Sequence, residues 1–287
     1  EGHKVAMQFT KKNMFEYQIE AEMEKTFYDL GAERLGYPSI VASGDNSCIL
    51  HYSTNRDKVA NDGLILIDAG AEYNMYSSDV TRTFPINGKF SSPQKDIYEE
   101  VLKAQLLGIN NVNTSNTMSG IHELTVASIS QSLVDLGLVP MGVDETVSMM
   151  HYFEFFMHGT GHWLGLDVHD AGSTEEKNKP RKLKPGMVTT VEPGIYIRPN
   201  KPEIEFKLLE RDPKEIRERR KQLGMEKATI LENEELKDAK SIKHKIPKDL
   251  LGIGIRIEDD IVCTEEDPIN LTSGAPKTIE DIEAICN

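Results

Sequence analysis

The chain has 287 residues, of which 38% are hydrophobic and 28% are charged, which is the composition of a folded globular protein rather than a disordered or fibrous one. Lys and Arg total 33 against 47 Asp and Glu, and the formal net charge of -14 argues against nucleic acid and against a polybasic membrane contact. No stretch approaches the roughly 18 consecutive apolar residues that a membrane-spanning helix needs, so we expect no membrane partner.

The elements are predicted from helical periodicity and strand composition, taken in chain order. The first helix runs from Asn13 to Leu30 and ends at Gly31. Later elements are strands at 48–52, 64–67 (after a turn at 61–63) and 79–84, helices from about 93 and over 121–136, strands at 188–191, 194–197 and 253–257, and a short helix after 278. Because strands and helices do not alternate regularly, the pattern favours an α+β fold over a doubly wound sheet.

Residues 201–250 differ in composition from the rest of the chain, since 26 of these 50 residues are charged. We expect a solvated insertion that contributes nothing to the core, within a single domain spanning residues 1–287. Inside the insertion, Asp212 and Pro213 predict the start of a helix that ends before Gly224.

Three widely spaced cysteines give little support to a disulfide framework or a cysteine zinc site, and they favour a reducing compartment such as the cytoplasm. The chain begins with Glu1 rather than Met, as a processed protein or a fragment does. A mitochondrial location therefore stays open.

Acidic residues stand at the ends of apolar strands. Asp68 follows one such strand, Asp79 lies eleven residues later, and Glu192 ends another strand just before a Pro-Gly turn. Asp68 alone reads as an ordinary turn former. The segment 158–170 adds three histidines within twelve residues, flanked by apolar residues among which idle imidazoles are costly to bury.

Arg256 and Glu258 fall on one face of a predicted strand, because side chains alternate with period two. A surface salt bridge is the alternative interpretation. The neighbours Ile253, Ile255 and Ile257 instead indicate a buried strand, where a charged pair needs compensation that a metal can supply.

Together these residues make an oxygen-rich ligand set of four carboxylates and one histidine: Asp68, Asp79, His162, Glu192 and Glu258. Two divalent cations balance the four carboxylates, with His162 neutral. Such ligands suit Mn, Fe, Co or Zn more than Cu, and two-metal hydrolytic sites hold their ions roughly 3.5 to 4 Å apart.

Five segments in this order resemble the catalytic domain of aminopeptidase P, the Xaa-Pro aminopeptidases: 67–70, 79–84, 158–170, 191–194 and 254–260. The resemblance covers nearly the whole chain except the charged insertion. It implies a pita-bread fold with two pseudo-symmetric halves around a curved antiparallel sheet. It also implies two metal ions, usually Mn, on the five residues named above, and a metal-bridging hydroxide that attacks the first peptide bond of a substrate with proline in second position.

The same resemblance implies further roles. Glu192 would also carry the proton from the nucleophile to the leaving proline nitrogen. His51, His158 and His169 match active-site histidines that position the substrate and stabilise the tetrahedral intermediate. Arg256 matches an arginine that orients acidic ligands, with a plain structural ion pair as the alternative.

Two departures limit the resemblance. Full-length members carry an amino-terminal domain that helps form the substrate entrance and the oligomer, and nothing in residues 1–287 corresponds to it, so a homo-oligomer stays possible. The connection from Ile197 to Gly252 is also longer than the family's. A surface elaboration, a partner site or a lid could account for it, and its composition favours the first.

Three alternatives remain. Prolidase uses the same metals on dipeptides alone, but the segment 163–170 favours aminopeptidase P. A non-catalytic pita-bread binding module typically loses metal ligands, whereas all five are present here. Methionine aminopeptidase fits the segment 256–260 poorly.

Overall fold

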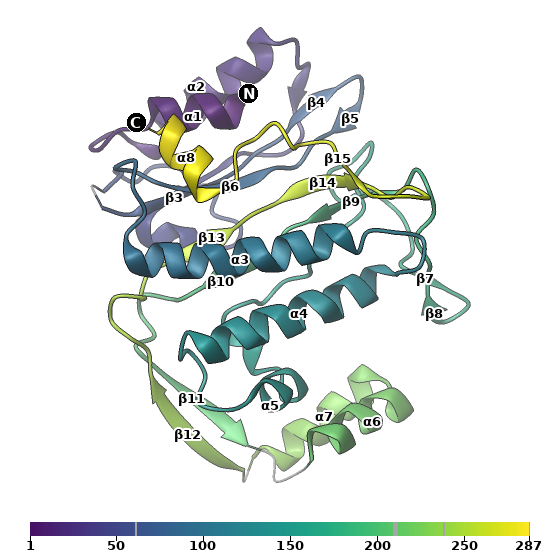
Figure 1. The fold of residues 1–287 in the computed structure, drawn as a ribbon. Coiled ribbons are helices and arrows are strands. Elements are labelled where there is room, and N and C mark those ends of the chain that lie inside the picture. The colour runs from purple at the N-terminus through teal and green to yellow at the C-terminus, as the bar shows by residue number, and fades with distance from the viewer. Residues whose placement is uncertain (61, 209–211, 238, 287) are drawn as a thin grey trace.

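The computed structural model describes residues 1–287 except 61, 209–211, 238 and 287. Its central strands lie between two groups of helices (Figure 1). On one side are α1 (Gly2–Phe9), α2 (Glu16–Asp29) and α8 (Ile279–Ile285), close to both chain ends, and on the other are α3 (Ser92–Asn110) and α4 (Met118–Asp135). The combination of helices with antiparallel strands confirms the predicted α+β class.

Two three-stranded antiparallel ladders form the centre of the molecule. The first has the order β2 (Ile40–Ser43), β3 (Leu64–Asp68), β6 (Thr81–Pro85), and the second has the order β15 (Ile269–Asn270), β14 (Asp259–Val262), β9 (Val188–Val191). A further pair joins β10 (Gly194–Tyr196) to β13 (Gly254–Arg256). The chain runs from β9 into β10 and from β13 into β14. The breaks between these strands, at residues 192–193 and 257–258, therefore face each other.

Smaller elements surround this centre. They are β1 (Arg34–Leu35), β4 (Ala71–Tyr73) and β5 (Tyr76–Ser77) in one sheet, the hairpin β7 (Glu175–Glu176) and β8 (Lys179–Pro180), α5 (Val143–Ser148), and the 3-10 turns η1 (Gly44–Cys48) and η2 (His151–Glu154). None of the helices in the described part of the chain is long and apolar enough to cross a membrane.

The main apolar core joins the first helices to the sheets. Met7 of α1, Ile19 of α2, Ile65 of β3 and Tyr98 of α3 belong to one buried cluster. At 25 cal/mol per Å² of apolar surface, each such side chain contributes roughly 1.5 to 3 kcal/mol when fully buried. The same cluster includes Ile195 of β10 and Ile255 of β13, so it packs the first ladder against the β10–β13 pair.

The predicted strand at 48–52 is wrong. The chain turns through η1, where Gly44 has a φ of +55°, and residues 49–63 that the structure describes form no strand except an isolated bridge at Lys58. The strand that pairs with β3 on this side is β2, which precedes the loop. Strand composition misled here because side-chain hydrogen bonds, rather than a ladder, order this loop. The predicted turn at 61–63 includes Asn61, which lies outside the described residues.

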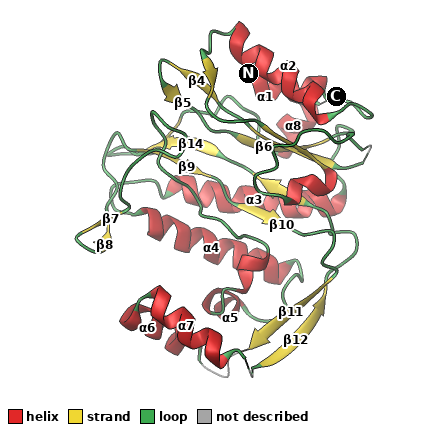
Figure 2. Cartoon of the chain, turned by 180° about the vertical axis from the view of Figure 1, so that it is seen from behind, coloured by secondary structure: helices red, strands yellow, loops and turns green. Residues whose placement is uncertain are grey.

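The charged insertion contains a hairpin and two helices, which lie beyond α4, on opposite sides of α5, in both views (Figures 1 and 2). They are β11 (Glu203–Leu208), α6 (Pro213–Leu223), α7 (Met225–Glu235) and β12 (Lys240–Lys245). The predicted helix before Gly224 is confirmed, and the Asp212 side chain accepts a hydrogen bond from the Lys214 amide.

The expectation that this insertion stays outside the core is wrong at the hairpin. Ile204 and Phe206 of β11, together with Ile246 and Leu250, are buried in the main core. Along β11 the inward apolar residues alternate with exposed acids such as Glu205. The high average charge of the segment therefore concealed a half-buried strand.

Candidate active site

The structure brings all nine predicted site residues to one cavity of about 270 Å³. They come from the ladders, from the loop before β3 and from the segment that precedes β7: His51, Asp68, Asp79, His158, His162, His169, Glu192, Arg256 and Glu258. A larger surface hollow of about 1040 Å³ beside α1 and α8 contains none of them.

Strand ends and strand breaks position the four carboxylates. Asp68 ends β3 opposite Thr81, and Asp79 lies just before β6, held near Asp68 by a backbone bond from the Ala69 amide to the Val80 carbonyl. Glu192 and Glu258 occupy the two facing breaks, β9–β10 and β13–β14. A residue at a break is released from the ladder, so its side chain can turn into the cavity.

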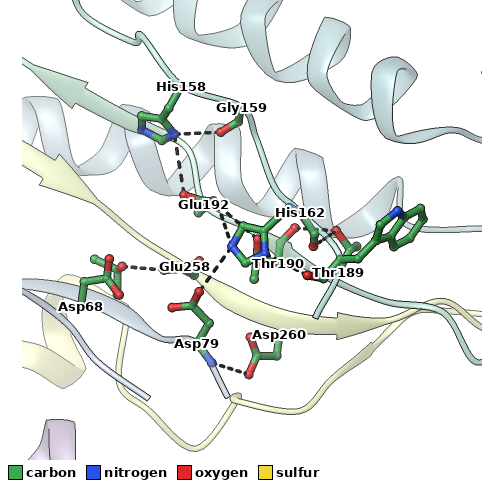
Figure 3. A network of polar contacts seen from close by, with 12 residues as sticks. Asp68, Asp79, His158, Gly159, His162, Thr189, Thr190, Glu192, Glu258 and Asp260 are labelled. Carbon is green, nitrogen blue, oxygen red and sulfur yellow. Dashed lines mark hydrogen bonds and ion pairs between the residues drawn. The ribbon is translucent and has the colours of Figure 1, made fainter. Parts of the chain in front are cut away.

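His162 lies between Glu192 and Asp79 (Figure 3). Its Nε2 atom is 3.4 Å from Oδ2 of Asp79 and 3.4 Å from Oε1 of Glu192. Its Nδ1 atom lies 3.0 Å from the Trp163 carbonyl, which can only accept, so Nδ1 carries a proton and Nε2 is the nitrogen that presents a lone pair to a cation once its own proton is lost. Asp79, His162 and Glu258 each offer a ligand atom within 4.8 Å of the other two.

The electrostatics of this cluster favour a bound cation. Burial raises the pKa of Glu258, and the charges of Asp79 and Glu192 raise it further. Burial and then Asp68 raise the pKa of Asp79. Burial lowers the pKa of His162, but Asp79 and Glu192 outweigh burial and raise it to about 9. Acids that destabilise one another in this way fit a divalent metal centre, which supplies the missing positive charge.

Arg256 supports the cluster from behind. Its Nη2 donates to Oδ2 of Asp68 at 2.5 Å, its Nη1 to the Tyr196 hydroxyl at 2.9 Å and its Nε to the Thr81 hydroxyl at 3.1 Å. The ion-pair partner of Arg256 is thus Asp68, whereas the sequence suggested Glu258. Because β13 ends at Arg256, the alternation of period two does not extend to Glu258, whose Oε2 accepts from Thr81 at 2.6 Å.

Sequence reasoning missed two tyrosines. The Tyr37 hydroxyl lies 2.5 Å from Oδ1 of both Asp68 and Asp79, and Tyr37 belongs to a turn-rich segment that carries no signal for such a role. The Tyr196 hydroxyl lies 2.8 Å from Nε2 of His158. Tyr196 ends β10, and a polar group at the end of an apolar strand, the signal used for the acids, could have found it.

The remaining histidines line the cavity in different ways. Burial, followed by the charge of Arg256, lowers the pKa of His158 to about 3, so its ring is neutral. The ring of His169 lies 4.2 Å from that of His162, centroid to centroid. His51 is exposed and belongs to the irregular loop after η1.

The sequence pattern of metallopeptidase family M24 matches residues 1–265. The chain belongs to metallopeptidase family M24. The Xaa-Pro aminopeptidase of Haemophilus influenzae is 43% identical over 287 residues, which are 100% of this chain and 56% of that protein. The human Xaa-Pro dipeptidase is 33% identical over 303 residues, covering 99% of this chain and 56% of that protein.

Solved structures of aminopeptidases have the same fold. Aminopeptidase PepP of Pseudomonas aeruginosa has a TM-score of 0.83 and 40% identity, covering 99% of this chain and 55% of that one. A Glu383Ala variant of Escherichia coli aminopeptidase P in complex with substrate has a TM-score of 0.82 and 37% identity, covering 99% of this chain and 55% of that one. The expected pita-bread fold and the resemblance to aminopeptidase P are thereby confirmed. This M24 chain spans about half the length of the relatives it matches.

Proposed function

We propose that this M24 chain is the catalytic part of a metal-dependent aminopeptidase that hydrolyses the N-terminal bond of peptides with proline in second position. The observation that carries the proposal is the convergence of five side chains from separate elements on one cavity: Asp68, Asp79, His162, Glu192 and Glu258. These five would hold two divalent ions. Carboxylate-rich ligand sets suit Mn²⁺, which we expect as the native metal.

When bound, the ions supply Lewis-acid activation of water and of the substrate carbonyl. The protein's own groups handle protons and orientation. The Glu192 side chain is 16% exposed on the cavity wall, where it can take a proton from the attacking water and deliver it to the proline nitrogen. Nδ1 of neutral His158 lies 3.7 Å from Oε2 of Glu192, so both side chains would contact the same part of the substrate.

His51, His158 and His169 surround the same cavity and would orient the peptide and stabilise negative charge as it develops on the carbonyl oxygen. Arg256 would hold Asp68 in a ligating orientation. If so, Arg256→Lys should lower the affinity for metal without unfolding the chain. A plain structural ion pair would instead leave the affinity for metal unchanged.

The metal and the substrate are tested together. We expect elemental analysis of unsupplemented protein to find divalent metal, and we expect an Xaa-Pro peptide of three or more residues to be cleaved after its first residue. Cleavage of the Xaa-Pro dipeptide alone would favour a prolidase, the second candidate, which the similarity to a human Xaa-Pro dipeptidase keeps open. Folded protein without metal or activity would favour a non-catalytic binding module.

Other expectations stay predictions. They are a single domain over 1–287 with the insertion at 201–250, a homo-oligomer, and a cytoplasmic location with a mitochondrial one as the alternative. Sedimentation analysis tests the oligomer, and microscopy of the tagged protein in its own cells tests the location.

A further inference from the structure

The loop that carries His51 is attached to one buried carboxylate. Glu16 begins α2 and is 0% exposed. Its side chain accepts five hydrogen bonds, all from residues 43–57: from the Ser43 amide and hydroxyl at 2.8 Å each, Nδ2 of Asn46 at 3.0 Å, the Tyr52 hydroxyl at 2.7 Å and the Asp57 amide at 2.9 Å.

The two carboxylate oxygens divide the loop between them. Oε1 takes the donors at its start, Ser43 and Asn46, whereas Oε2 takes Tyr52 and Asp57 near its end. The Glu16 amide also donates to the Asp57 carbonyl at 3.0 Å. One side chain therefore closes the loop at both ends, in a stretch where no strand ladder does so.

This arrangement is costly unless every bond is made. A buried carboxylate is tolerated only when hydrogen bonds replace its lost hydration, and the five groups that donate to Glu16 are all neutral. The donors Ser43 and Tyr52 flank Leu50 and His51, which both line the catalytic cavity. Moving Glu16 would therefore move the cavity wall, although Glu16 itself does not line the cavity.

We propose that Glu16 is a positioning residue, whose buried carboxylate fixes the loop 43–57 so that His51 faces the bound peptide. The inference rests on the proposed function, because it takes His51 to act on substrate. It differs from a plain structural role in that the effect of Glu16 on turnover must pass through His51.

The first test compares Glu16→Gln with Glu24→Gln. Both lie on α2, and Glu24 also accepts a hydroxyl hydrogen bond, from Ser39 at 2.8 Å, but outside the loop 43–57. A side-chain amide cannot accept at both ends, so in Glu16→Gln we expect kcat/KM to fall about 10- to 100-fold, the size of effect that a misplaced active-site group produces. Metal content should not change, since no proposed ligand lies in the loop. A fall of similar size in Glu24→Gln would overturn the proposal.

A double-mutant cycle separates positioning from general stability. With His51→Ala as background, adding Glu16→Gln should lower kcat/KM by less than about two-fold, because the group it positions is already absent. A further loss as large as in the wild-type background would overturn the proposal. Tyr52→Phe removes only the donor next to His51 and serves in the same cycle if Glu16→Gln does not fold.

A readout without activity keeps this inference distinct from the proposed function. Amide hydrogen exchange over residues 43–58 should become faster in Glu16→Gln and stay unchanged in Glu24→Gln. Unchanged exchange in Glu16→Gln would overturn the anchoring. If Glu16→Gln exchanges faster but the wild-type protein cleaves no Xaa-Pro peptide, the anchoring is supported and the proposed function is refuted.

Discussion

Glu258 is the most deeply buried of the proposed ligands, with 1% of its surface exposed. It sits at the break between β13 and β14, where its backbone amide and its carboxylate both meet Thr81. Of the four acids, it therefore has the least freedom to reorient. We therefore expect that no neighbouring side chain can replace the carboxylate of Glu258 by changing its rotamer.

The first prediction concerns this residue. Glu258→Ala should abolish metal-dependent cleavage of an Xaa-Pro peptide, because the cavity loses one of the four carboxylates that would hold the ions. Elemental analysis and kcat/KM are the measurements. Glu265→Ala, at an exposed acid after β14, is the matched control and should behave as wild type. Full activity in Glu258→Ala would refute the ligand assignment.

Which residues could be found from the sequence depended on local pattern. Asp68 and Glu192 were recognisable because each ends a short apolar strand, and His162 because it stands in a histidine-rich run. Tyr37 was not, since its place beside Asp68 and Asp79 arises from tertiary packing alone. Sequence patterns report periodicity along one element, but not which elements meet.

At the scale of elements, the same limit explains the two wrong predictions. The segment 48–52 has strand composition, yet Tyr52 within it and Ser43 before it donate hydrogen bonds to Glu16 rather than pairing with a partner strand. The hairpin β11–β12 was hidden inside a segment of high mean charge, although Ile204 and Phe206 alternate with acids as an amphipathic strand requires.

The second prediction concerns the helices of the insertion. The β11–β12 ladder ends with Leu208 paired to Lys240, so residues 209–239 can be replaced by a two-residue Asn-Gly turn. Because none of the described residues in 201–250 lines the cavity, we expect kcat/KM to stay within about two-fold of wild type, as for changes remote from the reacting groups. A ten-fold fall would instead assign α6 and α7 the role of a lid.

The third prediction concerns the junction between η2 and β11. His151 is 9% exposed, its ring lies 5.1 Å from that of Phe206, and its Nε2 has no hydrogen-bond partner among the described residues. Burial lowers its pKa from 6.5 to about 4, against the opposing charge of Glu154. Between these values the unfolded chain binds a proton that the folded chain does not. The free energy of unfolding should therefore fall as the pH drops from 6.5 to 4.

Urea unfolding at pH 7 and at pH 4.5 measures this loss, which linkage puts at up to roughly 3 kcal/mol for His151. His151→Asn retains a side-chain N–H but does not titrate, so its stability should decline less across the same window. Equal declines in both proteins would show that His151 is not responsible.

At the scale of the whole molecule, the proposed ligands come from both halves of the chain. Asp68 ends β3 and Asp79 lies just before β6 in the first ladder, whereas Glu192 directly follows β9 and Glu258 directly precedes β14 in the second. Arg82, which is 0% exposed, joins the halves by donating to the Glu258 carbonyl at 2.5 Å and to Asp259 at 2.6 Å. The family motifs predicted which residues would converge, but not that buried Arg82 links the two ladders.

The last prediction follows from this division. Bound metal would join the two ladders and neutralise carboxylates that otherwise repel one another, so chelation should destabilise the entire fold and not one loop. A ligand that binds only the folded state adds about 4 kcal/mol at a thousand-fold excess over its Kd, which for a chain of this size raises Tm by on the order of 10 °C. We expect EDTA to lower Tm and Mn²⁺ to restore it, by differential scanning calorimetry. In Glu258→Ala the same treatments should leave Tm nearly unchanged, and an equal response there would place the stabilising metal elsewhere.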